Sequence, residues 1–142
     1  MIQQTVIKIE DYICHKPLLT YKIDDYFLAK LYSLLLKHCL PHECVEHLMV
    51  AFGLLHQYVL SHNKLNNSNS HEELSASILD GDYFYSLYYE YCATHAFYLI
   101  EYDFASVLQK AEMDQLNNQE LPLLHYIKLF LEEGGLHRGL FS

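Results

Sequence analysis

The segment from Cys39 to His47 carries the densest group of potential metal ligands in the chain. It reads Cys39-Leu-Pro-His42-Glu-Cys44-Val-Glu-His47, and His38 precedes it. Thiolates and imidazoles are ligands that zinc prefers, but structural zinc sites usually take them from two separated pairs. Because the spacing here differs, we expect no bound metal and interpret the segment as the ordinary start of a helix. Zinc binding by these residues stays open as an alternative.

Two pairs of acids stand close together in the sequence, Asp24 with Asp25 and Asp80 with Asp82. Paired carboxylates can hold magnesium and a diphosphate, but acids at such positions more often cap a helix or occupy its first turn. No cluster of basic residues accompanies them. No possible nucleophile stands at an informative distance from His56. We therefore predict no catalytic residue.

Tyrosines concentrate between Tyr83 and Tyr102, where seven of the 13 in the chain lie. On a helix around 78–100, they make more than one face apolar. A helix that is apolar on all sides is covered on all sides. It is therefore either the central helix of the core or a helix covered by a partner, and tyrosine is enriched at such interfaces.

Hydrophobic periodicity and helix-capping residues predict an all-α fold, a single domain over residues 1–142. Ile2, Val6, Ile9 and Ile13 predict a helix over 2–13, and Asp24 or Asp25 can cap the next one. The polar stretch 63–70 predicts a loop. Six helices are expected, over 2–13, 26–39, 44–61, 72–94, 94–116 and 120–133.

Charge and composition exclude several classes of protein. The formal net charge is −9 and the nine basic residues are scattered, which disfavours nucleic-acid and anionic membrane surfaces. No uncharged apolar run reaches the roughly 18 residues of a membrane-spanning helix. We expect no signal peptide, because 1–13 carries two acids and no basic start. The four cysteines then indicate reduced thiols and a cytoplasmic protein.

Two segments, separated by a polar stretch, together resemble the trans-prenyl diphosphate synthases. Phe52–Val59 corresponds to the helix that ends in the first Asp-rich motif of that family, and the polar stretch 63–70 follows. Ile78–Ser86 then matches a helix that opens on a Gly-Asp pair, here Gly81-Asp82, followed by aromatic residues. The resemblance covers roughly 23–116 and implies a degraded form of the helical bundle of that family.

Gln57 and Tyr58 stand where catalytic members have their metal-binding aspartates, and no second Asp-rich motif follows. The chain in this respect resembles the small, non-catalytic subunit of bacterial heptaprenyl and hexaprenyl diphosphate synthases. This resemblance implies a catalytic large subunit as partner, which carries Mg²⁺ and makes the side-chain precursor of menaquinone. The small subunit supports activity and product chain length.

The resemblance also suggests site residues on the tyrosine-rich helix around 78–100 and on the helix before it. The expected partner interface comprises Asp82, Tyr83, Tyr85, Ser86, Tyr88, Tyr89 and Cys92. The hypothetical floor of a product tunnel comprises Leu55, Val59, Phe84, Tyr85 and Tyr88. Two alternatives remain, a metal-binding protein that uses Cys39–His47 and a helical adaptor that forms a homodimer through its tyrosines.

Overall fold

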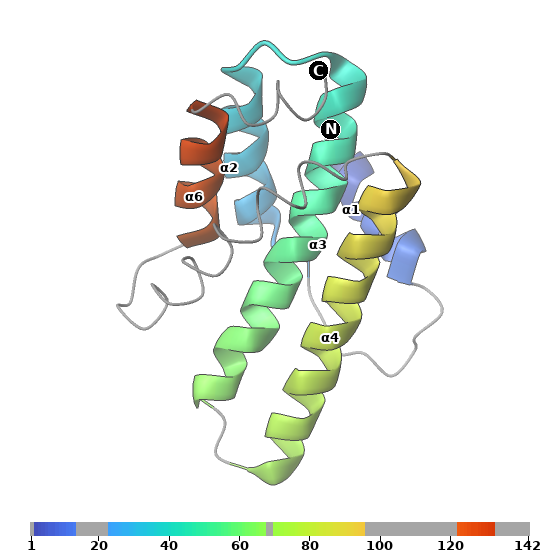
Figure 1. The fold of residues 1–142 in the computed structure, drawn as a ribbon, viewed down its shortest axis with the longest axis vertical. Coiled ribbons are helices and arrows are strands. Elements are labelled where there is room, and N and C mark those ends of the chain that lie inside the picture. The colour runs from blue at the N-terminus through green and yellow to red at the C-terminus, as the bar shows by residue number, and fades with distance from the viewer. Residues whose placement is uncertain (1, 14–22, 68–69, 96–121, 133–142) are drawn as a thin grey trace. The chain divides into compact units, whose positions relative to one another are not determined.

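The computed structural model describes residues 2–13, 23–67, 70–95 and 122–132, and these are helical apart from short connections (Figure 1). No β-strand occurs within these ranges, so the all-α prediction is confirmed. The helices are α1 (Ile2–Ile13), α2 (Asp25–Leu36), α3 (His42–Asn67), α4 (His71–Thr94) and α6 (Pro122–Glu132).

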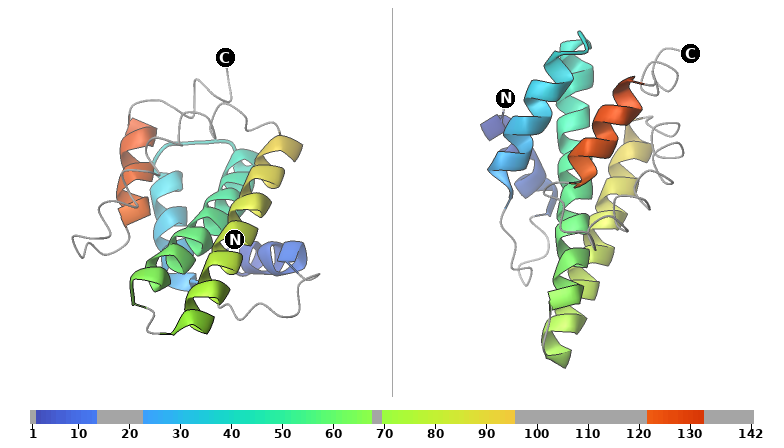
Figure 2. Two further views of the ribbon diagram at one scale, coloured as in Figure 1. Left: turned by 60° about the horizontal axis from the view of Figure 1, so that its bottom comes forward. Right: turned by 90° about the vertical axis from the view of Figure 1, so that its left-hand side faces the viewer.

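The chain divides into two compact units, Met1–Tyr88 and Tyr89–Ser142. In the first unit α1 packs on α2 and α3, and α2 packs on α3. The long helices α3 and α4 run side by side in opposite directions (Figures 1 and 2). The first unit therefore places α3 between the N-terminal helices and α4.

The middle of α3 is buried on all sides, because every residue from 48 to 57 is buried. Leu48, Phe52, Leu55 and Val59, which follow one another at helical spacing, are all buried. On α2, Phe27, Leu31 and Leu35 are buried, whereas Leu34 is half-buried. Each large apolar side chain removed from water contributes about 1.5–3 kcal/mol to the stability of the fold.

Gly53 lies where α1 and α2 meet α3. A Cβ atom at Gly53 would lie 2.7 Å from Cδ1 of Ile9 on α1 and 3.4 Å from Cδ2 of Leu28 on α2. Ile9 and Leu28 are themselves buried. The missing side chain of Gly53 therefore lets both helices approach the backbone of α3.

Gly81 lies on the side of α4 that faces α3, but its surroundings are less crowded. A Cβ atom there would lie 3.6 Å from Cβ of Ser61 and 3.7 Å from Cδ1 of Tyr58, both on α3. These are ordinary van der Waals separations. The contact places Gly81 directly against α3.

Several helix ends differ from their predicted positions. The helix α2 stops at Leu36 rather than Cys39, and the backbone of Cys39 has a left-handed φ of 52°. The amides of Lys37, His38 and Cys39 bond to carbonyls three residues earlier, as in a tightened last turn. This turn precedes Pro41, which cannot continue a helix.

The helix α3 runs to Asn67, six residues beyond the predicted end at Ser61 and into the stretch predicted as a loop. Adding a residue to an existing helix contributes one hydrogen bond, so polar residues with weak helix propensity are tolerated there. The helix α4 ends at Thr94, the predicted end of the helix over 72–94. The predicted helix over 94–116 falls mainly on residues outside the described part of the chain.

In the second unit α6 has one buried side. Leu123, Ile127, Phe130 and Leu131 are buried, and His125, Lys128, Leu129 and Glu132 are exposed. The spacing of the buried residues is that of an amphipathic helix. Within the described ranges, no helix is both long and apolar enough to cross a membrane.

We expect Gly53→Leu to lower the free energy of unfolding by about 1–3 kcal/mol, because the new side chain overlaps Ile9 and Leu28. In contrast, Gly81→Ala should raise it by roughly 0.5–1 kcal/mol, because alanine fits the space and favours helix. Urea denaturation followed by circular dichroism measures both. Equal effects of the two substitutions would contradict the difference in packing described here.

Candidate functional site

A polar contact joins the start of α2 to the middle of α3. Asp24 is the N-cap of α2, and its Oδ1 accepts a hydrogen bond of 3.0 Å from the backbone N–H of Phe27. Its Oδ2 lies 2.9 Å from Nε2 of His56, 32 residues further along the chain. We call these two residues the Asp24–His56 pair. One carboxylate thus caps one helix and binds the side chain of another.

The ring of His56 is enclosed. Only 3% of the residue is exposed, and the ring of Phe27 stacks on it with centroids 3.8 Å apart and an interplanar angle of 3°. The other ring nitrogen, Nδ1, is buried and has no hydrogen-bond partner among the described residues. Phe27 is therefore joined to His56 twice, directly by its ring and through Asp24 by its amide.

This arrangement determines the protonation state of the ring. Burial lowers the pKa of His56, and the hydrogen bond to Asp24 and the charge of Asp24 offset only part of that effect. A neutral ring with its hydrogen on Nε2 donates to Asp24 and leaves Nδ1 as a lone pair. A charged ring would bury an N–H without an acceptor, which costs about 1–3 kcal/mol.

The pKa of the Asp24 carboxyl group is also lowered, so that this group is charged at neutral pH. Burial acts to raise its pKa, but the hydrogen bonds that it accepts from His56 and Phe27 outweigh burial, so the pKa is lowered. The contact at neutral pH is therefore a hydrogen bond from a neutral imidazole to a carboxylate, rather than a pair of opposite charges.

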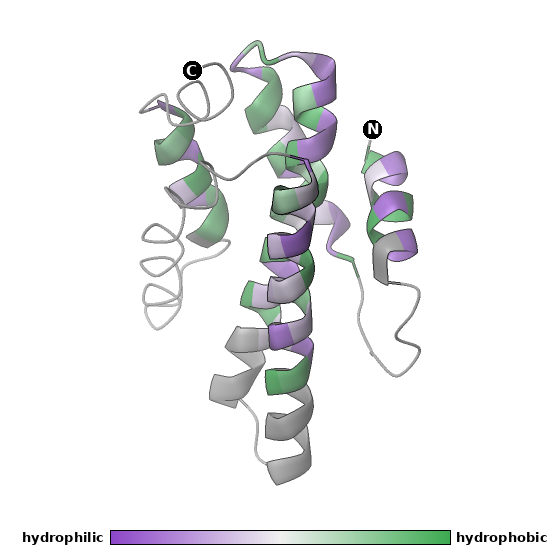
Figure 3. Ribbon diagram, turned by 45° about the vertical axis from the view of Figure 1, so that its right-hand side comes forward, coloured by the Kyte–Doolittle hydropathy of each residue, from purple (hydrophilic) through white to green (hydrophobic). Residues whose placement is uncertain are grey.

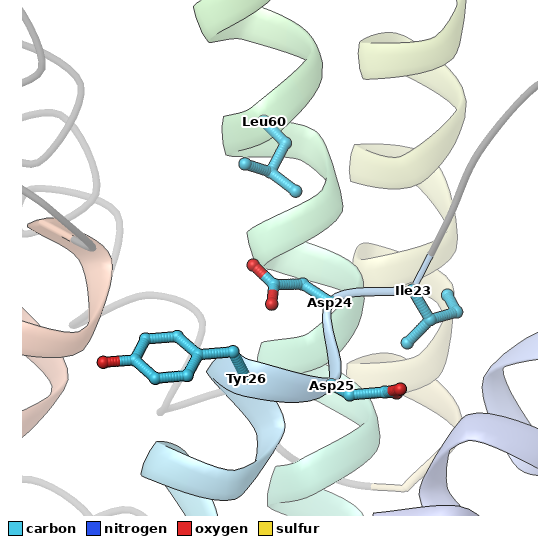
Figure 4. Close-up of a pocket in the computed structure, with 5 residues that line it drawn as sticks. All are labelled: Ile23, Asp24, Asp25, Tyr26 and Leu60. Carbon is cyan, nitrogen blue, oxygen red and sulfur yellow. The ribbon is translucent and has the colours of Figure 1, made fainter.

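A surface cavity of about 390 Å³ lies beside Asp24. Its lining residues are Ile23, Asp24, Asp25, Tyr26 and Leu60. Figure 4 shows Asp24 directed toward α3, whereas Asp25 and Tyr26 point away in different directions. These side chains do not converge on a common point, so the cavity offers solvent access to Asp24 rather than a shaped ligand site.

The geometry excludes His56 as a general base. A general base must reach its substrate within hydrogen-bond distance, and Nδ1 of His56 is enclosed. The pair therefore acts on the packing of α2 against α3. The sequence identified Asp24 as a possible cap and His56 as a helical histidine, but their spacing gave no indication that they meet.

The potential metal ligands in Cys39–His47 do not form a cluster. Cys39 is exposed in the turn after α2, while His42, Cys44 and His47 lie in the first turns of α3. His42 instead lies 3.1 Å from Glu46, one turn later. Within the described ranges, no three His, Cys, Asp or Glu side chains are grouped so as to hold a metal ion.

The residues predicted for a partner interface differ in exposure. Asp82, Ser86 and Tyr89 are exposed, Tyr83 and Tyr85 are half-buried, and Tyr88 and Cys92 are buried. Ile78 and Leu79 are also exposed, the latter to 68%, although the interface prediction omitted both. Figure 3 accordingly shows hydrophobic and hydrophilic residues mixed along α4.

The residues predicted for a tunnel floor are mostly buried. Leu55, Val59, Phe84 and Tyr88 are buried, and Tyr85 is half-buried. The ring of Tyr85 lies 5.1 Å from that of Tyr58 on α3 and 6.2 Å from that of Tyr88. These separations are typical of aromatic packing, and they join α4 to α3 on the side that carries Gly81.

The chain matches no protein-family model, no curated protein and no solved structure.

We expect Asp24→Ala to lower the free energy of unfolding by about 2–4 kcal/mol. The substitution removes the helix cap, worth about 1 kcal/mol, and leaves the buried N–H of His56 unpaired, at about 1–3 kcal/mol. Chemical denaturation at about pH 7 measures the change. The matched control is Asp25→Ala, since Asp25 is the exposed neighbour and should change stability by less than about 0.5 kcal/mol. Similar effects of both substitutions would refute the role given to Asp24.

We expect Cys44 to react much more slowly with iodoacetamide than Cys39. Burial raises the pKa of the Cys44 thiol to about 11, so on the order of one molecule in a thousand carries the reactive thiolate at about pH 8. Cys39 is exposed. Peptide mass spectrometry during alkylation measures both rates, with the urea-unfolded chain as control. Modification of Cys44 before Cys39 in the folded protein would be the contrary result.

Proposed function

We propose that this chain is the non-catalytic regulatory subunit of a heterodimeric long-chain trans-polyprenyl diphosphate synthase of the heptaprenyl or hexaprenyl type. In this proposal a separate catalytic subunit binds Mg²⁺ and the diphosphate substrates. The present chain supports the activity of that subunit and the length of its product, the side-chain precursor of menaquinone. The resemblance of 52–59 and 78–86 to the synthases is the starting point.

The observation that supports this proposal most directly is the two-sided environment of α4. Gly81 packs on Tyr58 and Ser61 of α3, and Tyr85 packs on the ring of Tyr58. Three residues near Gly81 on the same helix are exposed, namely Leu79, Asp82 and Ser86. The two segments that resemble the synthases thus contact each other, and α4 still presents a mixed apolar and polar surface to a partner.

The residue environment on α3 also favours a non-catalytic role. Gln57 occupies the position of a metal-binding aspartate in the resemblance, and it is buried at 4% exposure. Its neutral amide lacks the negative charge with which paired carboxylates hold Mg²⁺ against a diphosphate. Asp24 does not replace it, because both of its oxygens accept hydrogen bonds from within the chain.

Of the proposed tunnel residues, Tyr85 is the one with remaining exposure. Its ring is held between Tyr58 and Tyr88. In this proposal the ring of Tyr85 contacts the growing prenyl chain, while Leu55, Val59, Phe84 and Tyr88 support it from the core. A rigid aromatic side chain in that place would limit how many isoprene units fit.

Co-expression tests the proposal. The partner is a trans-prenyl synthase subunit with both Asp-rich motifs, encoded next to this chain. We expect the two chains to purify as a heterodimer, and we expect elongation of farnesyl diphosphate by isopentenyl diphosphate with Mg²⁺ only when both are present. Light scattering and product chromatography are the measurements. Turnover by this chain alone, a dimer of twice its 16.7 kDa, or zinc in protein purified without a tag would favour the other interpretations.

A substitution on the exposed side of α4 tests the interface. We expect Ser86→Arg to weaken the heterodimer by about tenfold or more, because a long charged side chain would enter the contact. Ser33→Arg is the matched control, since Ser33 is an exposed serine on α2. Circular dichroism checks that both variants fold. Equal binding of the two variants in titration calorimetry would place the partner elsewhere.

A further inference from the structure

We propose that the Asp24–His56 pair is a pH-sensitive switch that holds the first turn of α2 on α3 and releases this turn when the pair takes up one further proton. The proposal rests on the geometry of α2 and α3 and is independent of the proposed synthase partner.

The pair connects two helices through a single group. Oδ1 of Asp24 accepts from the amide of Phe27 in the first turn of α2, and Oδ2 faces Nε2 of His56 in the middle of α3. The Phe27 ring in turn stacks on the imidazole at 3.8 Å. A change in the protonation of either member therefore alters both the cap of α2 and its attachment to α3.

At neutral pH one hydrogen is shared along the contact, on Nε2 of His56. A second proton has no suitable place. On Oδ2 it would face the Nε2–H, and on Oδ1 it would face the amide hydrogen of Phe27. On Nδ1 it would be a buried donor without an acceptor among the described residues. A proton on either carboxylate oxygen weakens the hydrogen bond that Asp24 accepts from His56 or from Phe27, and a proton on Nδ1 leaves a buried polar hydrogen unsatisfied.

The direction of the pH effect follows from the lowered pKa values of His56 and Asp24. The pKa of His56 is lowered from 6.5 by burial, so below about pH 6.5 the unfolded or released ring binds protons that the packed ring does not. Acid therefore favours release. The lowered pKa of Asp24 adds a second loss of stability below its ordinary value of 3.8, because protonation then removes the cap.

Other charged groups near these helices do not compete with Asp24 for the ring. Asp25 is exposed, and its side chain points in a different direction from that of Asp24 (Figure 4). Lys30 of α2 lies over the ring of Tyr26, with 5.4 Å from Nζ to the ring centroid. Lys8 of α1 lies 3.7 Å from Glu46 of α3. The helix α4 carries five acids, Glu72, Glu73, Asp80, Asp82 and Glu90, and none of them is among the causes of the lowered pKa of His56.

Hydrogen exchange on the full chain between about pH 7 and pH 5 tests the switch, with protection corrected for the intrinsic exchange rate. We expect the first-turn amides of α2, including Phe27 and Leu28, to lose protection by up to about tenfold per pH unit once the ring titrates. The amides of α6 should stay unchanged. In parallel, the ring signals of His56 in nuclear magnetic resonance should titrate over the same pH range.

Two variants separate a switch from general acid sensitivity. His56→Gln keeps a donor near the position of Nε2 but cannot take a proton, so the protection of α2 should no longer depend on pH in this range. Asp25→Asn removes a neighbouring charge and should retain the response of the unmodified chain. If His56→Gln does not fold, coincidence of the His56 titration with the loss of α2 protection decides instead. Protection that is independent of pH in the unmodified chain, or lost equally in His56→Gln, would overturn the proposal.

Discussion

One carboxylate joins the N-terminal part of this fold to its longest helix. Asp24 caps α2 through Phe27 and at the same time accepts a hydrogen bond from His56, whose ring lies flat against the ring of Phe27. A buried histidine without such a partner would lose its hydrogen bonds to water and gain none in return. His56 therefore has a hydrogen-bond partner only when α2 lies in this position on α3. The ring of His56 in turn fixes the place of Asp24, and so the start of α2.

The apolar packing around this contact depends on the absence of a side chain at Gly53. Ile9 of α1 and Leu28 of α2 both approach its backbone, so three helices meet at one point of α3. Gly53 and His56 are three residues apart and therefore project from neighbouring faces of the helix. The close approach of α1 and α2 excludes water from the same region in which the polar contact lies. Low local polarity strengthens the Asp24–His56 hydrogen bond and raises the cost of leaving it incomplete.

The helix α4, which carries most of the clustered tyrosines, is exposed on one side and packed on α3 on the other. Its tyrosines suggested a helix covered on every side, but the structure distributes them between buried, half-buried and exposed positions, with Ile78 and Leu79 exposed near its start. Aromatic contacts with Tyr58 and the close approach of Gly81 attach one side to α3. The remaining side combines apolar residues with Asp82 and Ser86, a mixture typical of interfaces that form between separately folded subunits.

The sequence by itself determined the features that depend on neighbouring residues. It predicted an all-α chain, the bounds of α1, and a cap at Asp24 or Asp25, because periodicity and capping act over one or two turns. It could not predict that α3 continues to Asn67, since helix length there depends on propagation rather than on residue type. Nor could it predict that Asp24 meets His56 across 32 residues, or that Tyr88 is buried while Tyr89 is exposed. These outcomes depend on how the helices cross, and only the tertiary structure decides which polar group each buried side chain reaches.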